Sequence, residues 1–180
     1  MNNIKWELFN EDQRKRIEYG LKKGLDVSKF ADPSFDEKKM WAISWALQYG
    51  LDETWLLIPG LEVDQIEQIV EGMRLDMDVS KYADPKFNAD QMWMIRAGLR
   101  SKVDVSKYAD PKFSAEQMAV LSDGLEDGVD ISNYSDPNLS PEEMKRIWLQ
   151  LLEAKKATQP HHEAIALLHE PVFSPDYWLL

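Results

Sequence analysis

Three histidines near the C-terminal end, His161, His162 and His169, are the side chains of this sequence best suited to metal or acid–base chemistry. His162 and His169 are seven residues apart and would share one face of a helix. A catalytic zinc ion needs three protein ligands, and no third ligand stands at a fitting spacing. The chain has no cysteine, which excludes thiolate ligands and a thiol nucleophile. We therefore expect no metal, no cofactor and no catalytic residue, and interpret the histidines as part of a polar helix face.

Aspartates recur in two columns whose members are separated by 26 residues or a multiple of it. The first column is Asp26, Asp52, Asp78, Asp104 and Asp130, and the second is Asp32, Asp84, Asp110 and Asp136. Such ladders could hold cations or imitate the phosphates of a nucleic acid. An aspartate before a tight turn or a proline also accepts hydrogen bonds from nearby backbone N–H groups. Because the columns recur in nearly every unit, we favour this structural role.

The aspartate columns belong to a 26-residue unit that is repeated about six times without insertion. The units start at Phe9, Phe35, Leu61, Phe87, Phe113 and Leu139. The positions five, eight and twelve residues after each start are nearly always hydrophobic, and they fall on one face of a helix. Asn10, Asn88 and Ser114 are followed three residues later by glutamine, which predicts capping boxes at the helix starts. Glu62 takes the cap position in the third unit, so that helix start is less well defined.

Each predicted helix ends where Gly24, Gly50 and Gly128 suit a left-handed residue. Asp76 and Lys102 occupy the same place in the third and fourth units, where the helix end is expected to be slightly strained or differently closed. In the first five units the side chain eleven residues after the start is small, and this column is Gly20, Ala46, Gly72, Gly98 and Gly124. A glycine inside a helix costs up to about 1 kcal/mol. Its regular return predicts the close approach of a neighbouring backbone.

The second half of each unit predicts a short helical turn that a proline ends. One long helix and one short turn cannot bury a hydrophobic face alone, so neighbouring units must stack. The expected fold is all-α: a single domain over residues 1–180, an α-solenoid of six units with end caps. Trp6 and Leu8 would cap one end. The segment 153–180, with a longer helix at 158–170 and a final turn at 177–180, would cap the other.

Function is expected where units depart from their consensus. The second unit has Trp41, Trp45 and Tyr49 at intervals of four residues, and Trp93 shares the column of Trp41. Exposed aromatic side chains on a rigid helix are typical anchors of protein interfaces. The alternative is that this stripe packs on a terminal segment or in a self-dimer.

Charge is also uneven along the chain, whose net charge is −11. The unit 113–138 contains six acidic residues and no basic one. Glu116, Asp123, Glu126 and Asp127 would form an acidic patch that suits a basic partner, unless it is only a solvated helix face. The acidity disfavours direct binding to nucleic acid. The N-terminus lacks the pattern of a signal peptide and no stretch is long enough to span a membrane, so we expect a cytoplasmic protein.

The motif from Gly20 to Phe35, followed by Gln-Met as at Gln91-Met92 and Gln117-Met118, resembles short helical repeats in accessory proteins of bacterial mobile elements and phages. The resemblance covers residues 9–152. Such elements often counter host defences, and by analogy small acidic Cas9 inhibitors share the size and charge of this chain. We therefore expect a non-enzymatic, anti-CRISPR type of inhibitor that binds a basic, nucleic-acid-handling host protein such as a CRISPR nuclease. A scaffold that binds a peptide or itself is the alternative, and a nucleic-acid binder the third reading.

Overall fold

The computed structural model describes residues 4–158, and all regular structure within that range is helical. The α-helices of this range are α1 (Glu11–Lys22), α2 (Glu37–Gln48), α3 (Val63–Arg74), α4 (Ala89–Ser101), α5 (Ala115–Glu126) and α6 (Pro141–Thr158). The 3₁₀-helices are η1 (Trp6–Leu8), η2 (Val27–Lys29), η3 (Glu53–Leu56), η4 (Val79–Lys81), η5 (Val105–Lys107) and η6 (Ile131–Asn133). The prediction of an all-α protein is confirmed over these residues.

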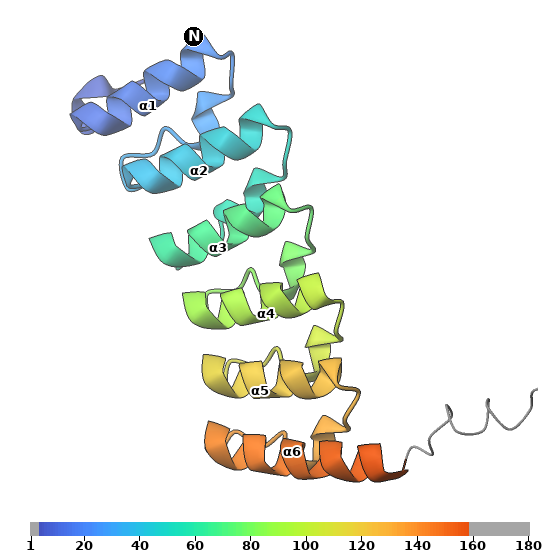
Figure 1. Ribbon diagram of the computed structural model, residues 1–180. Helices are drawn as coiled ribbons and strands as arrows, with labels where there is room; N and C mark the ends of the chain where they lie inside the picture. The colour runs from blue at the N-terminus through green and yellow to red at the C-terminus, as the bar shows by residue number, and fades with distance from the viewer. Residues whose placement is uncertain (1–3, 159–180) are drawn as a thin grey trace, which may run out of the picture.

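Successive α-helices lie side by side in chain order, with the short 3₁₀-helices along one edge of the row (Figure 1). Each α-helix from α1 to α5 packs on the next α-helix, and α1 to α5 each also pack on the 3₁₀-helix that follows them. None of the helices described here has both the length and the hydrophobicity needed to cross a membrane.

The helix starts follow the predicted caps. The Asn10 side chain accepts a hydrogen bond from Gln13 N, and Gln13 Oε1 accepts one from Asn10 N, both at 2.9 Å. Asn88 and Ser114 begin α4 and α5 with the same reciprocal pair. The departure at Glu62 does not shift the start of α3, because Gln65 Oε1 still accepts a hydrogen bond from Glu62 N at 2.6 Å. The left-handed helix ends are also confirmed, including φ values of 53° at Asp76 and 61° at Lys102.

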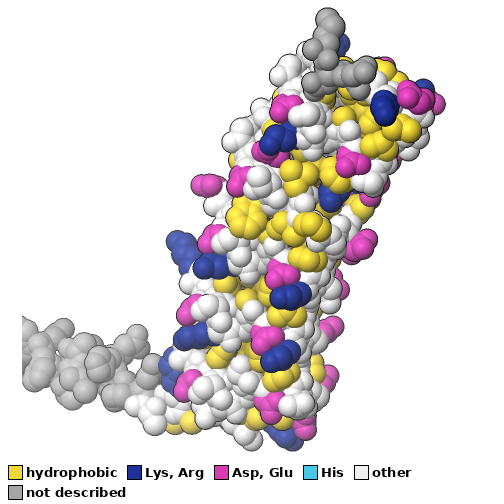
Figure 2. Space-filling view, turned by 180° about the vertical axis from the view of Figure 1, so that it is seen from behind, with side chains coloured by type: hydrophobic (Ala, Val, Ile, Leu, Met, Phe, Trp, Pro, Cys, Tyr) yellow, Lys and Arg dark blue, Asp and Glu magenta, His cyan; other side chains and the backbone are white. Residues whose placement is uncertain are grey.

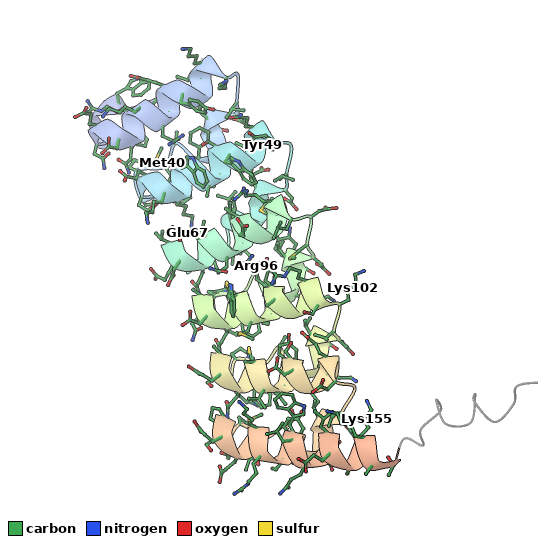
Figure 3. The ribbon with its side chains drawn as sticks, in the orientation of Figure 1. Met40, Tyr49, Glu67, Arg96, Lys102 and Lys155 are labelled. Atoms are coloured by element: carbon green, nitrogen blue, oxygen red, sulfur yellow. The ribbon has the colours of Figure 1, made fainter. Side chains whose placement is uncertain are left out.

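The core follows the predicted hydrophobic columns with one adjustment. Side chains five and eight positions after the unit start are almost fully buried, as at Met40, Met92 and Ile95, each 0% exposed (Figure 3 labels Met40). The position twelve residues after the start lies at the edge of the core, and Leu21 there is 48% exposed. Arg14 replaces the buried methionine in the first unit and is exposed, because α1 is the first α-helix of the described range and has an α-helical neighbour, α2, on one side only. A polar outer face is what an end unit of a repeat array requires.

The small-residue column leaves room for an aromatic ring that follows the 3₁₀-helix of the same unit. The prediction that a neighbouring backbone approaches this column is wrong. A Cβ added at Gly98 would overlap the Tyr108 hydroxyl and lie 3.1 Å from Tyr108 Cζ. Tyr108 follows η5, and its ring is 1% exposed because it folds back over α4. Gly20, Gly72 and Gly124 face the equivalent rings of Phe30, Tyr82 and Tyr134. In the second unit both partners change together, to Ala46 and the smaller Leu56, both 0% exposed.

A glutamine column joins four of the units to the unit that follows. Gln91 Nε2 donates hydrogen bonds to Pro111 O at 3.1 Å and to Phe113 O at 2.6 Å, where the chain enters the following unit. Gln13, Gln65 and Gln117 make the same pair of bonds. The sequence pattern had indicated only the capping role of these side chains. We call this arrangement the glutamine clamp.

The structure describes the predicted N-terminal cap but only the first part of the predicted C-terminal cap. Trp6 packs against the core, whereas Leu8 is 56% exposed, so its predicted part in an N-terminal cap is wrong. Helix α6 continues to Thr158. The remainder of the predicted C-terminal cap, with the histidines and the turn at 177–180, lies outside the described residues.

Candidate protein-docking surface

Both aspartate columns serve the backbone of their own unit, as the structural interpretation predicts. Asp104 Oδ1 accepts hydrogen bonds from Ser106 N at 3.2 Å and Ser106 Oγ at 2.6 Å, which caps η5. In the second column Asp110 Oδ1 accepts a hydrogen bond from Lys112 N at 3.0 Å. The Ser106 hydroxyl holds the pKa of Asp104 below its ordinary value, because it stabilises the ionised form. Oxygens bonded in this way are less available to bind a partner.

Three predicted anchors form one aromatic cluster on α2. Trp41 and Trp45 are stacked with ring centroids 6.4 Å apart, and the Tyr49 ring lies 5.2 Å from that of Trp45. Trp41 is 41% exposed and Tyr49 63% exposed, while Trp45 packs partly against the core. Figure 3 labels Tyr49 at the C-terminal end of α2. The exposed large side chains are therefore Trp41 and Tyr49, and Trp45 supports them.

A groove of about 900 Å³ lies beside this cluster, between α1 and α3. Ala42, Ile66 and Val70 form its apolar base, with the rings of Trp41 and Trp45. We call it the α1–α3 groove. The prediction identified its tryptophans but missed its walls on α1 and α3. The signal was present in the columns, because Tyr19, Trp45 and Glu71 all stand ten residues after a unit start.

The walls of the groove have opposite charge. The α1 wall includes Asp12, Lys15 and Arg16, for a net charge of +1. The α3 wall includes Glu67, Glu71 and Arg74, for a net charge of −1. Exposed ion pairs already link some of these groups: Lys15 lies 3.2 Å from Asp12, Arg74 lies 2.8 Å from Glu71, and Lys38 of α2 lies 3.4 Å from Glu67. Arg16 lies over the Tyr19 ring, 5.5 Å from its centroid.

Trp93 is exposed but belongs to a separate part of the surface. It is 51% exposed on α4, and the same column on α3, between Trp41 and Trp93, is occupied by Glu67. Figure 3 shows Glu67 on α3 and Arg96 between α3 and α4. Trp93 does not line the α1–α3 groove.

The four predicted acidic residues all lie exposed on or beside α5. Asp127 also makes internal contacts, because its Oδ2 accepts a hydrogen bond from Trp148 Nε1 at 3.1 Å and its carbonyl accepts one from Lys155 Nζ at 2.6 Å. Partial burial, together with Glu126 and Asp127, raises the pKa of Asp123. Glu116 and Glu126 are the acidic side chains of the patch most available to a partner.

Aromatic and acidic candidates share one face of the helix row. Positions three, six, ten and fourteen after a unit start are about one helical turn apart and so lie on the same side of their helix. The four columns contain, in this order, Glu116; Trp41 and Trp93; Trp45 and Asp123; and Tyr49 and Asp127. Figure 2 shows the side of the helix row turned away from the viewer of Figure 1, where hydrophobic side chains gather toward the N-terminal end and acidic and basic side chains are spread along the whole length.

The glutamine clamp is absent at the junction between α2 and α3. Lys39 stands where four other units have glutamine, and its Nζ lies 4.6 Å from the Phe35 ring centroid within its own unit. Lys39 therefore does not bind the carbonyl oxygens of Pro59 and Leu61 as a clamp glutamine would. The α1–α3 groove thus lies over a junction that lacks this pair of hydrogen bonds.

Lys39→Gln is expected to stabilise the protein by about 1 kcal/mol, because it supplies the missing hydrogen bonds between the second and third units. Chemical denaturation followed by circular dichroism measures the change in the free energy of unfolding. Lys39→Met, which has similar length but no donor, is the control and should bring no such gain. Equal stability of the two variants would contradict the clamp.

No group of histidine and acidic residues in the range 4–158 has the geometry to hold a metal ion. Comparisons with protein-family models, with curated proteins and with solved structures found no match to this chain. The described residues define an all-helical protein with a 26-residue sequence repeat, an exposed aromatic cluster and a groove beside it.

Proposed function

We propose that this chain is a non-enzymatic α-solenoid that binds a protein partner through the exposed face of its helices. The observation that supports this proposal best is the α2 cluster, in which Trp41 and Tyr49 stand open to solvent beside the partly buried Trp45, on a helix buried on its other side. Large aromatic side chains bury much area with little loss of conformational freedom, which makes them effective interface anchors. The aspartates that recur in the repeat are used as local caps, so they do not suggest a reaction.

We further propose that the partner is basic. The acidic α5 layer lies on the same face as the aromatic cluster, three helices further along the row. Layers of packed helices are about 8–10 Å apart, so one partner would have to span about 25–30 Å to contact both, an ordinary width for a protein interface. A host protein that handles nucleic acid, such as a CRISPR nuclease, has a positively charged channel of this kind. In this proposal the acidic layer would compete with nucleic acid for that channel.

A scaffold role is the second candidate, and the α1–α3 groove favours it. A groove with an apolar base and walls of both charges suits a peptide or another copy of the chain as well as a foreign protein. The two candidates differ in what the acidic α5 layer does, since a scaffold that uses only the groove does not need it.

Trp41→Ala combined with Tyr49→Ala is expected to weaken partner binding by at least tenfold, because two exposed anchors are lost. The two side chains are 41% and 63% exposed, so the variant should keep its fold. Affinity capture from bacterial lysate, quantified by mass spectrometry, compares it with the original chain. Leu8→Ala is the control, since Leu8 is 56% exposed in η1 and lies outside the four columns of the docking face. A partner captured equally well by all three proteins would contradict docking through the aromatic cluster.

Glu116→Lys combined with Glu126→Lys is expected to abolish inhibition of a purified CRISPR nuclease, measured as cleavage of target DNA at about 0.1 M salt. Glu116 lies in the first turn of α5 and Glu126 in the last, so the effects of the two reversals on the helix dipole should offset each other. Glu142→Lys is the control, because Glu142 occupies the same column as Glu116 but belongs to the sixth unit, outside the acidic layer. Full cleavage of the target DNA in the presence of the unaltered chain would exclude this nuclease as the partner. The binding of some other protein partner would still be tested by the capture experiment.

A further inference from the structure

We propose that the α1–α3 groove binds one amphipathic α-helix of the partner, about three turns long, lying alongside α2. The inference rests on the proposed protein-binding function and names the element of the partner that enters the groove. It is supported by the dimensions of the groove, by the chemistry of its base and by the charges of its walls.

The groove has the dimensions of a helix site. Its lining extends along α2 from Glu37 to Trp45 and along α3 from Val63 to Arg74. A 12-residue helix such as α3 is about 18 Å long, at 1.5 Å per residue. A partner helix of three turns therefore matches the length of the wall beside it. Its apolar face would enter the space of about 900 Å³ above Ala42.

The base of the groove selects a helix over an extended strand. Ile66 and Val70 are 2% and 5% exposed, and together with Ala42 they offer no hydrogen-bonding side chain. An extended peptide laid on this base would leave backbone N–H and C=O groups without partners, which is costly away from water. Binding as an added strand needs the open edge of a sheet, and the residues from 4 to 158 contain no strand. A helix bonds its own backbone and presents only side chains.

The wall charges specify the flanks of that helix. Lys15 is already paired with Asp12, so the net charge of +1 on the α1 wall comes from Arg16 and favours acidic residues on one flank of the hydrophobic stripe. The α3 wall keeps a net charge of −1 with Glu71 paired to Arg74, and it favours basic residues on the other flank. The chemistry that fits the groove is therefore a stripe of leucine or aromatic residues spaced i, i+3, i+4 and i+7, with acidic and basic residues on opposite sides.

Designed 14-residue helical peptides labelled with fluorescein test the inference by fluorescence polarisation against the full chain. The first peptide has a leucine stripe with glutamates on one flank and lysines on the other. Two further peptides keep the stripe and have only lysine or only glutamate on both flanks, and a fourth has serine in place of the leucines. We expect micromolar binding of the mixed peptide, at least threefold weaker binding of both single-charge peptides at about 50 mM salt, and no binding of the serine peptide. The difference between the charge patterns should shrink at about 500 mM salt, where exposed charges are screened.

Two protein variants show whether the groove is the site. Ala42→Glu places a charge on the groove base and should reduce binding of the mixed peptide at least tenfold, and Trp41→Ala should reduce it as well. Ala119→Glu introduces the same side chain at a partly exposed position on α5, outside the groove, and should bind like the original chain. Because Ala42 is 1% exposed, circular dichroism of Ala42→Glu must show the helical fold of the original chain. Equal binding of all four peptides, or full binding by Ala42→Glu, would overturn the inference.

Two further experiments distinguish a partner helix from other possible occupants of the α1–α3 groove. A peptide of residues 159–180 of this chain that displaced the mixed peptide would show that the groove takes its own C-terminal segment, and would overturn a partner helix. Concentration-dependent dimerisation in sedimentation velocity that is abolished by Ala42→Glu would assign the groove to a second copy and also overturn it. If none of the peptides binds, the helix inference fails, but the proposed protein-binding function does not. That function is tested separately by affinity capture with the Trp41→Ala and Tyr49→Ala variant.

Discussion

Gly98→Ala is expected to destabilise the protein by about 2–3 kcal/mol, although alanine is the better helix former. The intrinsic gain of alanine over glycine inside a helix is at most about 1 kcal/mol. Against it stands the overlap of the new Cβ with the Tyr108 hydroxyl, in a core where both residues are almost fully buried. Overpacking of a close-packed core costs more than that gain, because the ring can move only by displacing its neighbours. Urea denaturation followed by circular dichroism measures the loss.

The second unit provides the rescue for this change. Ala46 and Leu56 occupy the equivalent positions there and are both 0% exposed, so a larger helix residue is paired with a smaller residue after the 3₁₀-helix. Gly98→Ala combined with Tyr108→Leu should therefore cost less than the sum of the two single changes, by at least 1 kcal/mol in a double-mutant cycle. Additive costs would mean that the glycine column is required for some reason other than the ring.

Gln91→Leu is expected to destabilise the protein by about 3 kcal/mol or more. It removes the bonds from Nε2 to Pro111 O and Phe113 O and also the bond that Oε1 accepts from Asn88 N. Three backbone groups lose their partner at a site where Gln91 is 5% exposed, and each unsatisfied buried group costs about 1–3 kcal/mol. Leucine recovers part of this cost by burying apolar surface. The free energy of unfolding, again from urea denaturation, gives the measurement.

Gln150→Leu is the matched control for the clamp. Gln150 is exposed on α6, so its replacement should change stability by no more than about 0.5 kcal/mol. Hydrogen exchange adds a second readout, because loss of the clamp should raise exchange rates first in α5, the helix next to the broken junction. A Gln91→Leu protein as stable as the Gln150→Leu protein would show that packing alone holds successive units together.

Only part of the α1–α3 groove could be predicted from the sequence. The departures Trp41, Trp45 and Tyr49 were visible because they break a strict repeat, and the structure brings them into one cluster. Tyr19 and Glu71 were not singled out, since a groove wall needs no unusual residue type. A groove wall forms when residues at equivalent positions on neighbouring helices lie on the same side of the helix row. Such residues can be recognised when equivalent positions are compared across units.

The sequence by itself determined the period of the repeat, the helix starts and ends, and the role of the aspartates. These features depend on contacts over two to four residues, such as Asp104 with Ser106 or Asn10 with Gln13, and a short stretch of chain contains both partners. Only the tertiary structure decided what faces Gly98, what Gln91 binds across the junction, and that Asp127 is occupied by Trp148. Those contacts join residues 10 to 22 positions apart in the sequence. They exist because each short 3₁₀-helix turns the chain back over its own α-helix, and local preferences do not specify which side chains then meet.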